Sequence, residues 1–117
     1  MTVPAEIADA VIKAKAAVAK AETVLITALN ANPRVTGVVP AARDALAKAR
    51  TAERAAFDAE AGANLDSPGV RNLLAVLAVI NGNLKEVTDD LKETLEDLQR
   101  FAKVAKGFAG LLKAFLG

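Results

Sequence analysis

The stretch LKEVTDDLKETLEDLQRFAKVAKGFAGLLKAFL, residues 84–116, decides the fold class. Its apolar residues recur at spacings of three or four, which is the repeat of one face of an α-helix and not the alternation of a β-strand. This C-terminal seam comprises Leu84, Val87, Leu91, Leu95, Leu98, Ala102, Ala105, Phe108, Leu112 and Phe115. We therefore predict a single amphipathic helix over these residues, about 50 Å long at ~1.5 Å per residue.

Three segments upstream carry related patterns. The first opens at Pro4, a residue tolerated in the first turn of a helix, and keeps a narrow apolar seam of mostly small side chains. The third follows Ser67-Pro68, which resembles an N-cap and a proline at the first helical position. The predicted helices span residues 4–31, 40–61, 68–81 and 84–116. The chain is thus predicted to be all-α: one domain over residues 1–117, an antiparallel helical bundle of three to four helices with a long C-terminal amphipathic helix.

The boundary between the last two helices has two interpretations. Gly82 can end a helix, and Asn83 with Glu86 three residues later resembles a capping box. Against a break, the apolar phase continues through residues 77–91 without a slip. We favour a break or kink at residues 81–83 and keep one continuous helix as the alternative. The segment Val70–Ile80 is apolar nearly all round, so we predict it at the centre of the core.

Composition points to a thin core. Alanine occupies 27 positions, and hydrophobic residues make up 53% of the chain, too many for a disordered protein. Alanine favours helix but buries little area per residue. Stability then requires long interfaces or another subunit, which favours a homo-oligomer.

The sequence holds few groups for catalysis. It has no histidine, cysteine, tyrosine or tryptophan, and this removes the usual general base near neutral pH and the thiol nucleophile. The acidic cluster Asp89–Glu93 lacks a facing acidic partner, so we interpret it as a solvated face and not as a metal site. We expect no enzyme activity and neither cofactor nor metal.

Net charge and hydropathy limit the partners. A formal charge of +1 argues against nucleic acid as a partner. The N-terminus has acidic residues early and no unbroken apolar stretch, so it does not resemble a signal peptide. The longest apolar run is far below the ~20 residues that span a bilayer. We expect a protein that stays in the cytoplasm or is exported without a classical signal, with peripheral membrane attachment left open.

Arginines form a stripe on the second predicted helix. Arg43, Arg50 and Arg54 are spaced by seven and four residues, which places them on one side. Residues 57–99 hold nine acidic and three basic side chains. One hypothesis is that the arginine stripe meets this acidic stretch, within one chain or between two, and the alternative is two independently solvated faces.

The C-terminal segment 100–117 combines an apolar and a basic side. Its basic side, with Lys103, Lys106 and Lys113, is a candidate contact for anions, as is the arginine stripe. The candidate oligomer or partner interface comprises Phe101 and six residues of the C-terminal seam: Leu91, Leu95, Leu98, Phe108, Leu112 and Phe115. The simpler interpretation is that this segment is the end of a core helix whose basic side faces water.

Three functions remain from the sequence. We favour a non-enzymatic structural or interaction protein that self-assembles or packs on another protein through long amphipathic helices. The first alternative is a protein that binds an anionic membrane or lipid surface through segment 100–117. The second is a small helical adaptor, chaperone or inhibitor that covers an apolar surface of its partner.

Overall fold

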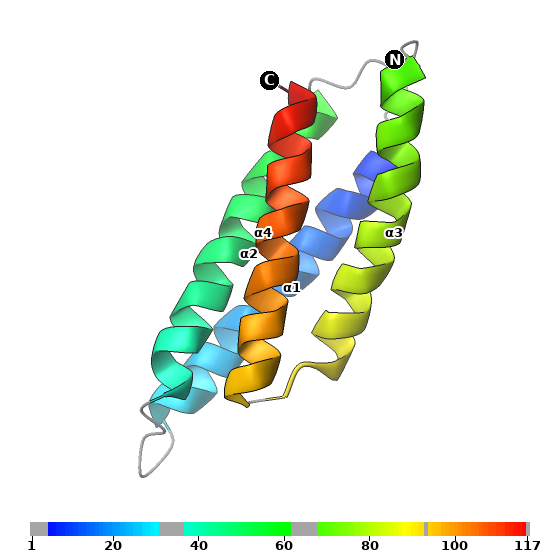
Figure 1. Cartoon of the computed structure of the whole chain (residues 1–117). Helices are drawn as coiled ribbons and strands as arrows, with labels where there is room; N and C mark the ends of the chain where they lie inside the picture. The colour runs from blue at the N-terminus through cyan, green and yellow to red at the C-terminus, as the bar shows by residue number, and fades with distance from the viewer. Residues whose placement is uncertain (1–4, 31–36, 62–67, 93, 117) are drawn as a thin grey trace.

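The computed structural model describes residues 5–30, 37–61, 68–92 and 94–116. These residues form four helices, α1 (Ala5–Asn30), α2 (Val38–Ala61), α3 (Pro68–Asp90) and α4 (Leu95–Leu116) (Figure 1). No strand occurs in the described part, so the all-α prediction is confirmed. The helices form an elongated bundle with extents of 54 × 20 × 20 Å.

Each helix in the bundle touches two others. Neighbours are α1 with α2, α2 with α4, α4 with α3, and α3 with α1. Consecutive helices run in opposite directions, whereas α1 and α3 run side by side in the same direction, as do α2 and α4 (Figure 1). The connection from α2 to α3 therefore joins helices that lie diagonally opposite in the bundle.

Side-chain size explains why the helices pack unequally. The buried residues of α2 are mostly alanine, and α4 contributes Ala102, Ala105 and Ala109 to the same core. Small side chains let helix axes approach closely, and α2 makes its most extensive contacts with α4 and α1. On α3 the buried side chains are instead Leu77, Leu84 and Val87, and this helix contacts its neighbours less extensively.

The favoured break at residues 81–83 is wrong, and so is the single helix over residues 84–116. Helix α3 continues through Asn81, Gly82 and Asn83 to Asp90, and α4 begins at Leu95. A side chain added at Gly82 would meet open space, so nothing forces the helix to end there. The side chain of Asn81 donates a hydrogen bond to the backbone O of Glu6 in α1 at 3.2 Å. A contact between distant residues thus outweighs the local stop signal.

Capping at Thr94 defines the start of α4. Its Oγ1 accepts a hydrogen bond from the backbone N–H of Asp97 at 3.2 Å, and its carbonyl accepts one from Leu98 N–H at 3.1 Å. Glu96 and Asp97 lie in the first turn, where the helix dipole favours negative charge. The sequence carries this N-cap signal as Thr-Leu-Glu-Asp, although a helix start at Thr94 was not predicted.

Replacing Thr94 by alanine is expected to lower the free energy of unfolding by about 1 kcal/mol, because one backbone donor of α4 loses its acceptor. Urea denaturation measures this loss. Thr51→Ala is the matched control, since the Thr51 hydroxyl only donates back to Ala47 O within α2 at 3.0 Å. The control is expected to change stability little. Equal effects of the two variants would argue against a cap at Thr94.

The prediction that Val70–Ile80 forms the centre of the core is wrong for most of the side chains that can be judged. Leu77 is buried, but Val76 is exposed and Val79 is 64% exposed. The side chains of Leu73 and Leu74 lie outside the described residues. The reason is the position of α1. The hydrogen bond from Asn81 to Glu6 places the start of the described part of α1 beside Asn81, so the turns of α3 before Asn81 extend past α1 and are not covered by it.

Candidate interaction surface

The residues predicted as an interface lie mostly inside this chain's own core. Leu91, Leu98, Phe101, Phe108 and Leu112 are all buried. Leu95 is 43% exposed, and the side chain of Phe115 lies outside the described residues. In this fold the C-terminal seam is therefore covered by the chain itself, and an external contact surface must use other residues.

The basic side of segment 100–117 faces outward on α4. Lys103, Lys106 and Lys113 are exposed, while the phenylalanines at 101 and 108 point into the bundle core. Lys103 and Lys106 line a shallow groove between α2 and α4 that also includes Lys48 and Asp44. Binding to a lipid interface through the apolar side of α4 would require these phenylalanines to leave the core.

The arginine stripe lies exposed on α2, beside α1. Arg50 Nη2 lies 3.5 Å from Glu22 Oε1 of α1, across an open groove of about 610 Å³. Arg54 lines the same groove, and Arg43 is also exposed. Helix α2 is not a neighbour of α3 within the described residues, and α3 carries Glu86, Asp89 and Asp90. The hypothesis that the stripe pairs with this acidic stretch within one chain is wrong for Arg50, whose carboxylate partner is Glu22.

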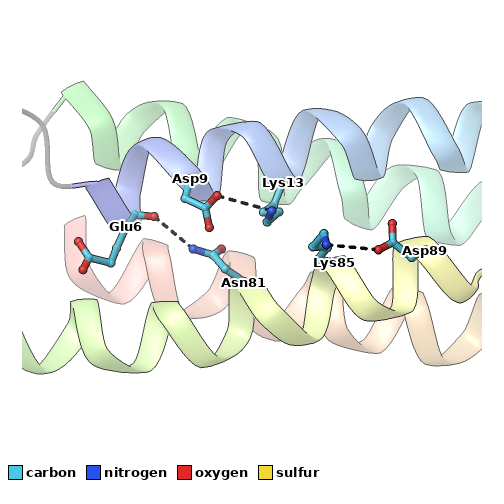
Figure 2. A network of polar contacts seen from close by, with 6 residues as sticks. All are labelled: Glu6, Asp9, Lys13, Asn81, Lys85 and Asp89. Carbon is cyan, nitrogen blue, oxygen red and sulfur yellow. Dashed lines mark hydrogen bonds and ion pairs between the residues drawn. The ribbon is translucent and has the colours of Figure 1, made fainter.

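A polar row runs between α1 and α3. Asn81 is 2% exposed, and its amide Nδ2 bonds to Glu6 O (Figure 2). Asp9 with Lys13 at 3.6 Å, and Lys85 with Asp89 at 3.7 Å, form ion pairs along each helix. These pairs are solvent-accessible and contribute little stability. The Oδ1 atom of Asn81 is buried and has no hydrogen-bond partner among the described residues.

The face of α1 that points away from the core carries a second line of uncharged residues. We call this line the outer seam: it consists of Ile12, Ala16, Ala19, Thr23 and Ile26, spaced by four, three, four and three. All five are exposed, Ile12 by 63% and Ile26 by 57%. This is the heptad spacing of a helix–helix contact, although no helix of the described chain covers it.

Hydrogen bonds within α1 satisfy the threonine hydroxyls on and beside the outer seam. The Thr23 hydroxyl donates to Ala19 O at 3.0 Å, and the neighbouring Thr27 hydroxyl donates to Thr23 O at 2.8 Å. Both donors are therefore satisfied within α1 and do not require water. A partner could cover this face without leaving these hydroxyl protons unpaired.

The other helices differ from α1 on their outward faces. Helix α2 exposes Arg43, Asp44 and Arg54 there, and α4 exposes Arg100 and three lysines. Helix α3 exposes Val76 and Val79 near one end, but acidic residues and Lys85 near the other. On α1 the charges flank the outer seam: Lys15 and Glu22 on the side of α2, and Lys13 and Lys20 on the side of α3. This second repeat was not predicted, although its spacing is visible in the sequence beside the repeat of α1 that is buried.

The described residues offer little for chemistry. They contain no group of three or more histidine, cysteine, aspartate or glutamate side chains placed to hold a metal ion. No helix among them is long and apolar enough to cross a bilayer. Comparisons with protein-family models, with curated proteins and with solved structures find no match for this chain.

Proposed function

We propose that this chain is a non-enzymatic structural or interaction protein that packs against another protein through the outer seam of α1. The observation that carries the proposal is an uncharged, exposed repeat of heptad spacing on the outward face of a helix. A helix of a self-sufficient bundle places charged and polar residues on its solvent side. On α1 isoleucine and alanine occupy that side, as in the contact faces of coiled coils.

Packing energetics support the same proposal. Two isoleucines more than half exposed leave apolar area in water, and burying such a side chain fully contributes about 1.5–3 kcal/mol. The bundle's core is alanine-rich, so contact with a partner would add a substantial fraction of the stability that folding alone provides. The charged residues that flank the outer seam would stay at the rim of the contact, where they remain hydrated.

Cysteine reactivity in the cells that make the protein tests this proposal. The natural chain has no cysteine, so a single one introduced at Ala19 reports on the outer seam. Ala47→Cys is the matched control, because Ala47 is exposed in the middle of α2. We expect a membrane-permeant maleimide to label Ala19→Cys at least about twofold more slowly than the control in cells that overproduce the protein, as for a site that is about half occupied. The two should react equally after unfolding in urea. Equal rates in the folded state inside the cell would overturn the proposal.

A further inference from the structure

We infer that the partner of the outer seam is a second copy of this chain, whose α1 lies antiparallel to the first. The inference rests on the proposed function, and it adds the identity of the partner and the orientation of the partner's α1. Three features of α1 support it: the sizes of the side chains along the outer seam, the charges beside it, and the area that it offers.

From Ile12 to Thr23 the size pattern of the outer seam fits its own reverse, whereas Ile26 of each copy lies opposite Asp9 of the other, at the edge of the contact. When two α1 helices run antiparallel about a two-fold axis near residues 17 and 18, Ala16 of one copy lies against Ala19 of the other. The same register brings Ile12 of each copy opposite Thr23 of the other, a large residue against a smaller one. Alanine at the centre lets the helices approach closely. An isologous contact of this kind closes after two copies.

The flanking charges favour the antiparallel direction. On the side of α2, Lys15 and Glu22 border the outer seam seven residues apart, so Lys15 of each copy faces Glu22 of the other. On the side of α3, Lys13 faces Lys20, and Asp9 lies 3.6 Å from Lys13 and offsets that repulsion. A parallel pair would instead place Lys15 beside Lys20 on both flanks without bringing an acid opposite either.

The area of the outer seam determines the affinity to expect. From Ile12 to Ile26 the outer seam is about 21 Å long, and with a helix width of ~10 Å a pair of such faces buries on the order of 400 Å² in total. This area is below that of stable complexes, so we expect a dissociation constant on the order of 0.1 mM. The dimer is thus a concentration-dependent species, and the measurement must reach millimolar protein.

Sedimentation equilibrium of the full chain from about 10 µM to about 1 mM tests the inference. We expect a monomer–dimer equilibrium that Ala19→Arg weakens at least about tenfold, because a long charged side chain at the centre prevents close approach. Ala47→Arg on α2 is the matched control and should dimerise like the natural chain. Circular dichroism checks that both variants keep the helix content. A natural chain that stays monomeric at the highest concentration, or a dimer that Ala19→Arg leaves intact, would overturn the inference.

Disulfide trapping then tests the direction. Mixing Ala16→Cys and Ala19→Cys proteins under mild oxidation should give the mixed dimer in preference to either homodimer, because position 16 faces position 19 only in the antiparallel pair. Preferential homodimers of each variant would contradict the antiparallel arrangement. A purified monomer combined with slow labelling of Ala19→Cys in cells would reject the second copy and retain the proposed function. Labelling of Ala19→Cys as fast as the control, in cells that hold the protein well above this dissociation constant, would reject the function itself.

Discussion

Replacing Phe108 by alanine is expected to lower the free energy of unfolding by about 3–5 kcal/mol, a large part of the stability of a domain of this size. Phe108 is fully buried, and its ring is among the largest side chains in the core. Helix α2, which packs on α4, buries mostly alanine, and alanine has no rotamers that could move into the space left. The cavity would therefore persist, and cavities that cannot collapse are the costly ones. Urea denaturation of both proteins measures the loss.

Phe57→Ala makes the same chemical change at an exposed position and serves as the control. The Phe57 ring lies on the surface of α2 with Lys15 Nζ 5.1 Å from its centre, so its loss is expected to cost about 1 kcal/mol. The comparison also tests the sequence-based prediction that Phe108 belongs to an interface. In that case Phe108→Ala would weaken assembly and leave the stability of the monomer almost unchanged.

The sequence predicted the secondary structure and the faces of the helices well. Spacings of three and four placed Leu98, Phe101, Phe108 and Leu112 on one side of a helix, and the structure buries all four. An apolar repeat indicates that one face of a helix is covered, but it does not indicate which element or molecule covers that face. A seam that meets another helix of the same chain and a seam that meets a partner have the same repeat. The interface prediction therefore chose the wrong seam for an external contact.

Helix boundaries were less predictable because several local signals compete. The sequence offers a stop at Gly82 and an N-cap at Thr94, and each is plausible from its neighbours alone. The structure uses Thr94, and it keeps Asn81 inside a helix where its amide reaches Glu6, 75 residues earlier in the chain. No local rule includes that contact. The pairing of Arg50 with Glu22 was missed for the same reason, since it depends on which helices become neighbours.

The outer seam of α1 shows a different limit of prediction from sequence. The sequence of α1 holds two apolar repeats, one on its buried face and one along the outer seam. The buried repeat was predicted because it holds more large residues. Only the packing of α2 and α3 against α1 shows that the repeat through Ile12 and Ile26 is left uncovered. A search for uncharged repeats on the polar side of each helix would have found it.

Replacing Asn81 by aspartate is expected to lower the free energy of unfolding by about 3 kcal/mol or more, whereas leucine at the same position should raise it slightly. Asn81 is 2% exposed, and its Nδ2 is the donor to Glu6 O. Aspartate keeps the shape, loses that donor and places a charge at a buried position, next to a carbonyl oxygen. Leucine loses the hydrogen bond but removes the buried Oδ1 that lacks a partner among the described residues.

The two variants separate stability from specificity at the contact between α1 and α3. A buried polar residue can fix the register of neighbouring helices at some cost in stability. If Asn81 has this role, Asn81→Leu should be more resistant to urea and yet allow α1 and α3 to slide. Slower or faster amide hydrogen exchange in the first turns of α1 would report the change, with Asn83→Leu on the exposed side of α3 as the control. Equal stability of the aspartate variant and the natural chain would show that the amide is not enclosed, and would contradict the packing of α1 on α3 described above.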